Sequence, residues 1–367
     1  MKNLIPDNDY ILLTPGPLST SKRVRAALLK DWCTWDAEYN AMVEDMRAKL
    51  LNIARCSDKY TAVLMQGSGS FSVESVIGTA LGEKDKLLII ANGAYGKRMD
   101  DIANVLKINH RVILTPEKEI YSAEELDKVL KLDKDITHVA FVHCETTTGI
   151  LNPLENLAKV VKANEKILIV DAMSSFGGIV IDVEGLEIDY LISSANKCIQ
   201  GVPGFGFVIA KKDTLMETKG NARSLSLDLY DQWNAMEKGN GKWRFTSPTH
   251  VVHAFYEAIQ ELQDEGGVVK RNERYLLMQK TLVMGMQKLG FRAYVKEELQ
   301  SPIITTFCYP ENRQFEFKAF YDFLKTKGFV IYPGKLSDED TFRIGNIGDI
   351  QLEDIKRLIK AISEYSA

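Results

Sequence analysis

Short runs of Val, Ile and Leu alternate with amphipathic stretches along the first two thirds of the chain, and this alternation limits the possible folds more than any other feature. Segments such as 71–81 and 95–106 space their apolar residues as amphipathic helices do. Strands buried on both faces of a parallel sheet are continuous apolar runs, and helices connect them. The chain is therefore predicted to be an α/β protein with a large doubly wound, mostly parallel sheet. The predicted strands are 60–65, 86–91, 111–114, 137–143, 166–170, 190–194 and 205–210.

The pattern changes in the last third of the chain. The final two of the strands just given have no helical stretch between them, so one strand is expected to be antiparallel. Beyond them, a helix is predicted at 250–264, and a second one follows Gly266-Gly267 and continues to about residue 288. Strands at 302–307, 329–332 and 341–344 then alternate with helices at 315–325 and 352–363. This predicts an N-terminal arm at 1–20, a large domain at 21–255 and a smaller C-terminal α/β domain at 256–367. A ligand is expected at the carboxyl ends of the strands, near the domain interface.

Composition and charge exclude several classes of partner. The 367 residues include 46 Lys and Arg against 50 Asp and Glu, a formal net charge of −4, so no general basic surface for nucleic acid is expected. No apolar run approaches the ~18 residues of a membrane span, and the first residues lack the apolar core of a secretory signal. The five cysteines form no CxxC pair, and the five histidines form no HxH or HxxxH cluster. A cytoplasmic protein without a bound metal is therefore expected.

The run Gln66-Gly-Ser-Gly-Ser70 follows a predicted strand and precedes a predicted helix. Glycine lets the backbone approach a ligand closely, and the free N–H groups at a helix N-terminus attract anions. Since the serine hydroxyls add donors, Ser68, Gly69 and Ser70 form a candidate phosphate or carboxylate site. The alternative is an ordinary turn in which Ser70 caps the helix. The run matches neither a Walker loop nor a dinucleotide fingerprint.

Two charged residues follow other predicted buried strands. Asp171 ends the run 166–170, where a carboxylate needs a cation such as a protonated pyridine nitrogen or a metal. Lys197 follows the run 190–194, where partial desolvation would let it lose its proton and form a Schiff base. Alone, Asp171 could equally cap a turn, and Lys197 could be a solvated surface lysine. Together with the anion site they indicate a pyridoxal phosphate site, in which Tyr95 is the candidate to stack on the cofactor ring.

These motifs resemble those of the class V aminotransferases of pyridoxal phosphate fold type I, over nearly the whole chain. The resemblance implies a transaminase with pyridoxal 5′-phosphate as cofactor and with Lys197 and Asp171 as catalytic residues. It also implies a homodimer, because Thr246 corresponds to a residue that reaches the cofactor phosphate of the other subunit. The matching runs are Thr14–Pro17, Gln66–Ser70, Asp171–Ser175, Ser193–Phe205 and Arg244–His250.

The resemblance implies further contacts with cofactor and substrate. Arg343 would clamp the acidic group of the substrate, with a structural salt bridge as the alternative. Gly16 would lie beside the substrate, and Arg244 is the next candidate to hold the acidic group. The residues implied to bind the cofactor are Ser68, Gly69, Ser70, Tyr95, Thr146 or Thr147, Asp171, Asn196, Lys197 and Thr246.

The runs around Lys197 and Thr246 resemble the phosphonate-specific branch of the family. They imply transfer of the amino group of 2-aminoethylphosphonate to pyruvate, giving phosphonoacetaldehyde and L-alanine, with a neutral Lys197 moving the proton. A serine–pyruvate or alanine–glyoxylate aminotransferase is the alternative. A cysteine desulfurase would need a mobile thiol, a role that Cys198 does not suit because it lies in the turn beside Lys197. A ligand-binding relative without activity is disfavoured by the presence of both Asp171 and Lys197.

Overall fold

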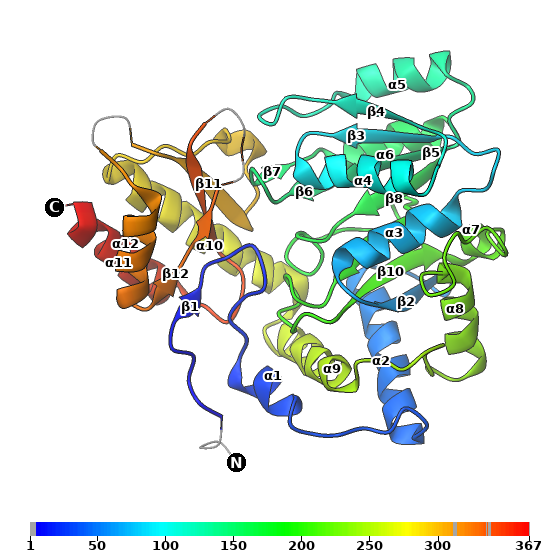
Figure 1. Ribbon diagram of the computed structural model, residues 1–367, viewed down its shortest axis with the longest axis horizontal. Coiled ribbons are helices and arrows are strands. Elements are labelled where there is room, and N and C mark those ends of the chain that lie inside the picture. Colours follow the sequence, from blue (N-terminus) through cyan, green and yellow to red (C-terminus); the bar gives the residue numbers. More distant parts are fainter. Residues whose placement is uncertain (1–4, 311–313, 335, 337–338, 367) are drawn as a thin grey trace.

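A seven-stranded mixed sheet forms the larger part of the molecule (Figure 1). The computed structural model describes residues 5–310, 314–334, 336 and 339–366. Across the sheet the strand order is β2-β10-β9-β8-β5-β3-β4, and β10 runs antiparallel to both of its neighbours. This confirms the predicted α/β fold and the expected antiparallel strand. The bounds are β2 (Tyr60–Gln66), β3 (Leu87–Ala91), β4 (His110–Leu114), β5 (His138–Val142), β8 (Ile167–Asp171), β9 (Tyr190–Ser194) and β10 (Phe205–Lys211).

Helices connect these strands and cover both faces of the sheet. The helices α3 (Gly69–Ala80) and α4 (Ala94–Val105) pack against each other, and so do α5 (Ala123–Leu132) and α6 (Leu154–Ala163). Right-handed crossovers put the first pair on one face and the second pair on the opposite face. The chain leaves β3 toward β4 but leaves β5 toward β8, so the winding reverses between β3 and β5. Ligands of doubly wound folds bind at the carboxyl ends of the strands around such a reversal.

Other helices close the free edge of the sheet around β2. The helices α2 and α8 contact β2, and α9 packs against α1 and α2. The short helix α7 and the helix α8 occupy a segment for which the sequence pattern predicted no element. Within the described residues, no helix is both long and apolar enough to cross a bilayer. The bounds are α1 (Lys22–Ala27), α2 (Ala37–Ile53), α7 (Lys212–Met216), α8 (Leu229–Lys238) and α9 (Thr249–Asp264).

A smaller α/β domain forms the C-terminal part, drawn in yellow, orange and red in Figure 1. Its antiparallel sheet has the order β11-β14-β13, and α10 and α12 pack against each other beside it. The predicted single strand at 329–332 is wrong, because its two halves pair differently: β12 pairs with β1 and β13 with β14. The bounds are β1 (Ile11–Leu12), β11 (Ile304–Cys308), β12 (Phe329–Val330), β13 (Tyr332–Pro333), β14 (Thr341–Gly345), α10 (Gly267–Lys288), α11 (Phe317–Thr326) and α12 (Leu352–Ser366).

Two separate hydrophobic clusters form the cores of the two domains. The buried residues of α9, up to Leu262, belong to the larger cluster, whereas those of α10 from Tyr275 onward belong to the smaller one. The expected boundary at 255/256 therefore falls inside α9, and we propose that the domains instead meet at Gly266 and Gly267, between the two helices. The N-terminal arm, of which residues 1–4 lie outside the described part, joins the smaller domain, because Leu13 and Leu18 lie in its core.

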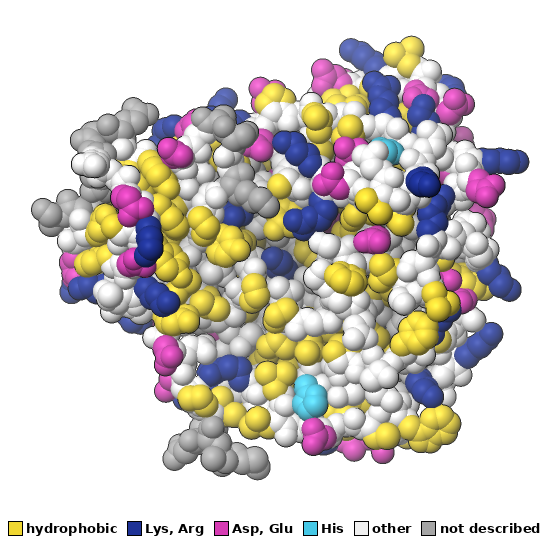
Figure 2. Space-filling model, in the orientation of Figure 1, with side chains coloured by type: hydrophobic (Ala, Val, Ile, Leu, Met, Phe, Trp, Pro, Cys, Tyr) yellow, Lys and Arg dark blue, Asp and Glu magenta, His cyan; other side chains and the backbone are white. Residues whose placement is uncertain are grey.

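The surface carries charges of both signs. On the face drawn in Figure 2, Lys and Arg side chains are interspersed with Asp and Glu side chains, mostly toward the rim. This distribution agrees with the near balance of 46 basic and 50 acidic residues in the sequence. Hydrophobic side chains gather across the middle of the same face (Figure 2).

Candidate active site

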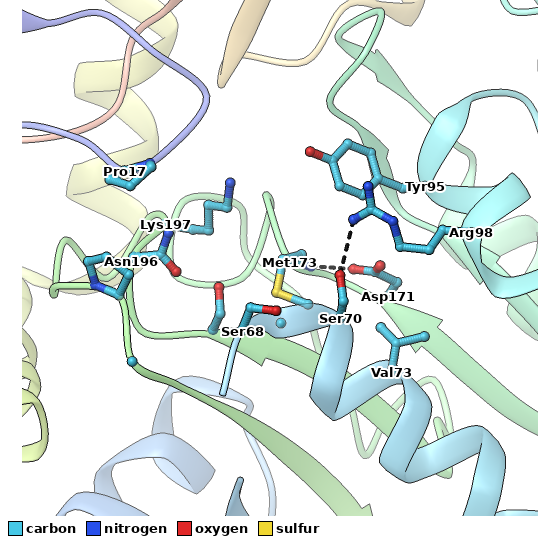
Figure 3. Close-up of a pocket in the computed structure, with 14 residues that line it drawn as sticks. Pro17, Ser68, Ser70, Val73, Tyr95, Arg98, Asp171, Met173, Asn196 and Lys197 are labelled. Carbon is cyan, nitrogen blue, oxygen red and sulfur yellow. Dashed lines mark hydrogen bonds between the residues drawn. The ribbon is translucent and has the colours of Figure 1, made fainter. Parts of the chain in front are cut away.

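A cavity of about 380 Å³ opens at the carboxyl ends of the central strands, next to the reversal of the winding. Seven of the residues singled out from the sequence line it together: Ser68, Gly69, Ser70, Tyr95, Asp171, Asn196 and Lys197. Figure 3 shows how they converge: the Lys197 side chain lies across the cavity from Tyr95, and Ser70 and Asp171 lie below them in this view. The other lining residues are Pro17, Val73, Arg98, Met173, Ser194, Pro203 and Gly204.

The turn between β2 and α3, where the sequence predicts an anion site, lies at the wall of this cavity. The helix begins at Gly69, and its N-cap residue Ser68 makes no side-chain capping bond, so the first N–H groups and this hydroxyl keep their donors. A Cβ on Gly69 would lie 2.3 Å from the Met173 sulfur, so a larger residue here would have to displace the Met173 side chain. The alternative in which Ser70 caps the helix is wrong, because Ser70 lies inside the first turn and its hydroxyl accepts a hydrogen bond from Arg98.

Asp171 ends β8 with its carboxyl group buried at the base of the cavity. Its Oδ1 accepts the main-chain N–H of Met173 at 2.8 Å. Burial raises the pKa of Asp171 to about 6, and the nearby Glu145 carboxylate adds to this effect. An ionised carboxylate at this depth requires a cation beside it, and a protonated ring nitrogen has the required charge and size.

Lys197 lies in the turn after β9 and points into the same cavity (Figure 3). Its Nζ donates to the main-chain oxygen of Pro15 at 2.7 Å. Burial lowers the pKa of Lys197 from 10.5 to about 8, and the positive charge of Arg343 acts in the same direction. The amine therefore becomes neutral, and nucleophilic, at a lower pH than an exposed lysine.

Gly16 leaves the space that this lysine needs. A Cβ on Gly16 would lie 2.8 Å from the Lys197 Nζ, and its φ of +112° is a conformation that favours glycine. The structure thus places Gly16 beside the Lys197 amine, and its contact with the substrate stays a prediction.

Glu145, which no sequence motif singled out, is fully buried in the hairpin of β6 (Cys144–Glu145) and β7 (Ile150–Leu151). Its Oε2 accepts the N–H groups of Tyr95 and Gly96, at 3.2 and 3.4 Å. These are N–H groups of the first turn of α4, so the carboxylate is stabilised by the N-terminus of that helix and holds Tyr95 in place. In the sequence, Glu145 stands two residues after the predicted strand at 137–143, a position that by itself assigns it no role.

The two candidate threonines lie behind the cavity wall. The Thr146 hydroxyl is 2.7 Å from the Ser174 hydroxyl, and the Thr147 hydroxyl donates to Glu145 at 2.7 Å. Both side chains are buried, and neither lines the cavity. Their contact with the cofactor therefore stays a prediction.

Arg343 projects from β14 of the smaller domain and is also buried. Its Nε and Nη1 donate to the main-chain oxygens of Pro333 and Thr146, at 3.0 and 3.2 Å. Among the described residues no carboxylate lies within salt-bridge distance, so the alternative of a structural salt bridge finds no partner. A buried guanidinium without an acidic partner is suited to an anionic ligand.

Three further residues are held away from the cavity. Arg244 pairs with Asp231 at 3.0 Å, and its Nη1 donates to a main-chain oxygen. Thr246 is exposed on the segment before α9, so within one chain it does not reach Lys197. Cys198 is buried, donates to the Ser174 oxygen at 3.2 Å and has a pKa raised by burial, which does not fit the mobile thiol of a desulfurase.

Comparison with known proteins decides the family. The model of the family described as "Aminotransferase class-V" matches residues 21–341. The chain belongs to the class V aminotransferase family. This class V aminotransferase is also similar over nearly its whole length to solved structures of the same fold. These include an aspartate aminotransferase of subgroup IV from Thermus thermophilus (TM-score 0.87, 20% identity, 97% of this chain and 99% of that one). Another is pyridoxamine-pyruvate aminotransferase from Mesorhizobium loti (TM-score 0.88, 23% identity), a match that covers 97% of this chain and 93% of that one.

Two curated relatives are much more similar in sequence. The chain is 60% identical over 359 residues to a Bacillus cereus protein named 2-aminoethylphosphonate–pyruvate transaminase, covering 98% of each. It is 58% identical over 364 residues to the bifunctional phosphonoacetaldehyde hydrolase/aminoethylphosphonate transaminase of Clostridioides difficile (strain 630). This match covers 99% of the chain but spans only 57% of that bifunctional relative.

Pyridoxal phosphate is the cofactor of this family, and the cavity fits it. A glycine-lined helix N-terminus with free donors suits the phosphate, and the buried carboxyl of Asp171 suits a protonated ring nitrogen. Lys197 brings a primary amine into the same space. The fold type and the cofactor predicted from the sequence are thereby confirmed.

Proposed function

We propose that this class V aminotransferase moves the amino group of 2-aminoethylphosphonate to pyruvate, giving phosphonoacetaldehyde and L-alanine. The observation that carries the proposal is the 60% identity, over 98% of both chains, to relatives named for this reaction. The site agrees with it, because Lys197 and Asp171 line one cavity, and the buried Arg343, which does not line it, is near enough for its charge to lower the pKa of Lys197. Five free cysteines support our further proposal of a cytoplasmic location.

Each residue of the site has one proposed task. The turn Ser68–Ser70 and Asn196 hold the phosphate, Tyr95 stacks on the ring, and Asp171 keeps the ring nitrogen protonated. When bound, pyridoxal phosphate supplies an aldehyde for the amine and a ring that accepts electrons. Lys197, neutral once displaced by the incoming amine, removes the proton from the amino-bearing carbon and later returns it.

The test of this proposal is a spectroscopic titration of the purified holoprotein. Adding 2-aminoethylphosphonate should change the absorbance of the bound cofactor within one turnover, and pyruvate should restore it. L-Serine with pyruvate and L-alanine with glyoxylate are the two comparison pairs. A larger kcat/KM with either of these pairs would replace the proposal with a serine–pyruvate or alanine–glyoxylate aminotransferase.

Replacing Arg343 with lysine should weaken both half-reactions. The planar guanidinium can pair bidentately with either a phosphonate or a carboxylate, and a lysine cannot copy that geometry. A charge-assisted contact contributes ~1.5–3 kcal/mol, so each kcat/KM should fall by roughly ten- to a hundredfold, with little change in cofactor content. Single-turnover titrations with each substrate measure the two effects separately.

A selective result would contradict this shared clamp. If Arg343→Lys impaired the pyruvate half-reaction alone, another cation would have to hold the phosphonate. Arg244 could do so only after leaving Asp231, with which it pairs at 3.0 Å.

We also propose a homodimer whose two sites each use a residue of both chains. Phe71 and Phe245 are each 50% exposed, and both line a hollow that also includes Gly67 of the anion-site turn. Exposed aromatic side chains beside an active site are typical of an interface. Thr246 follows Phe245 directly, so a second chain seated on this hollow would bring its own Thr246 toward the phosphate.

Mixing two inactive variants tests the shared site. Lys197→Ala lacks the reactive amine, and Thr246→Glu would repel the phosphate of the neighbouring chain. If sites are shared, a heterodimer contains one site with both defects and one intact site, so activity should rise to about a quarter of the wild-type level at random exchange. No gain, after exchange is verified by mass, would refute the assignment of Thr246.

A further inference from the structure

Arg98 is a charged residue of the cavity to which the sequence analysis gave no role. It lies one turn along α4 from Tyr95 and lines the same space. Its Nη1 donates to the Ser70 hydroxyl at 3.0 Å, and its guanidinium carbon lies 4.9 Å from the centre of the Tyr95 ring. Figure 3 shows this arginine between Tyr95 and Ser70, on the opposite side of the cavity from Lys197.

The charges of the cavity residues suggest which group Arg98 could bind. Among the described residues that line it, the cations are Lys197 and Arg98, and the acid is Asp171. A phosphate monoester carries about −1.5 to −2 charge at pH 7. The turn Ser68–Ser70 offers hydroxyls and N–H groups, which are partial charges, and Lys197 becomes bonded to the cofactor aldehyde. Arg98 is therefore the remaining full positive charge beside the anion site.

The charge of Arg98 lowers the pKa of the nearby Asp171, but among the described residues Arg98 forms no ion pair. Its side-chain hydrogen bond in the described part of the chain goes to a neutral hydroxyl, and no carboxylate lies within 4 Å of it there. A guanidinium has five N–H donors in a planar fork, of which this contact uses one. The remaining donors lie at a cavity whose ligand carries a phosphate.

We infer that Arg98 binds the cofactor phosphate together with the turn Ser68–Ser70 and, through its contact with the ring of Tyr95, links the phosphate site to the stacking residue. The inference rests on the cofactor site proposed above, but not on which amine is the donor. It also explains why Ser70 faces α4 instead of capping α3.

Comparing two ligands that differ only in the phosphate tests the inference. Apoprotein is titrated with pyridoxal 5′-phosphate and with pyridoxal, and each Kd is measured from absorbance. In Arg98→Gln the Kd for the phosphate ester should rise about 10- to 100-fold, because a charge-assisted bond is lost. The Kd for pyridoxal should change less than about threefold, because this ligand has no phosphate to lose contact with.

Three further variants make the result specific. Arg98→Lys keeps the charge without the fork and should recover part of the affinity for the phosphate ester. Tyr95→Leu should weaken both ligands alike, since stacking does not depend on the phosphate. Arg111→Gln is the matched control, because Arg111 is exposed on β4 with its nearest carboxylate, Asp133, at 3.9 Å, and it should change neither Kd.

Two results would overturn the inference. Equal weakening of both ligands by Arg98→Gln would mean that Arg98 acts only through the shape of the pocket, and an unchanged Kd for both would mean that it binds nothing. Thermal unfolding of each apoprotein checks folding, and if Arg98→Gln does not fold, the same ligand comparison in Arg98→Lys decides. Failure of the wild-type apoprotein to bind pyridoxal 5′-phosphate would instead refute the cofactor site itself.

Discussion

Replacement of Lys197 by alanine is expected to abolish amino transfer, with a loss of at least about a thousandfold. The amine is the only primary amine among the described residues of the cavity, and its pKa of about 8 makes it far more available than an exposed lysine. Alanine removes both the covalent attachment of the cofactor and the base that moves the proton. The measurement is the single-turnover rate with 2-aminoethylphosphonate, followed by the cofactor absorbance.

A chemical trap identifies the attachment independently of turnover. Borohydride reduction of the wild-type holoprotein should leave the cofactor mass on the peptide that contains Lys197, and Lys197→Ala should carry no such adduct. Lys197→Arg is the matched control, because it keeps the positive charge but cannot attach the aldehyde. An adduct on a different lysine of the wild type would remove Lys197 from this role.

The positions of Asp171, Lys197 and the turn Ser68–Ser70 could be predicted because each follows a buried strand. Strands of one sheet that run in the same direction have their carboxyl ends at the same edge. Residues that follow such strands therefore lie close together, even before the packing of the helices is known. The apolar runs are long enough to locate those strands: the predicted strand at 190–194 is observed at Tyr190–Ser194. The resemblance to a family then assigned the roles.

Arg98 and Glu145 could not be assigned in the same way. Arg98 is one of several charged residues on an amphipathic helix, and only the packing of α4 against α3 shows that it faces Ser70. Glu145 needs the hairpin of β6 and β7, which turns it under the first turn of α4. Both depend on contacts between segments that the local pattern does not relate.

Arg244 and the domain boundary show a second limit. The guanidinium of Arg244 forms an ion pair with Asp231 of α8, a helix that the sequence pattern did not predict. The boundary was expected at 255/256, where the strand pattern of the large domain ends, but α9 continues to bury its apolar face in the large core as far as Leu262. The last helix of one domain and the first helix of the next have the same apolar periodicity. Only the core against which each helix packs shows the domain to which it belongs.

Asp171→Ala is expected to slow proton removal by about a hundredfold or more while cofactor binding is largely kept. The phosphate contacts and Lys197 remain, so attachment of the cofactor does not require the carboxylate. The ring, however, accepts electrons well only while its nitrogen is protonated. Burial raises the pKa of Asp171 to about 6, but a cationic nitrogen beside it favours the ionised form, so the pair is stable near neutral pH.

Two variants separate the charge of this carboxyl from its shape. Asp171→Asn keeps the size and the acceptor for the Met173 N–H but has no charge, so its single-turnover rate should fall nearly as far as that of Asp171→Ala. Asp171→Glu keeps the charge but moves it, and it should retain an intermediate rate. A wild-type rate in Asp171→Asn would mean that the ring nitrogen needs no anion here. If the single-turnover rate fell equally in all three variants and their affinity for pyridoxal 5′-phosphate was lost as well, Asp171 would only shape the pocket.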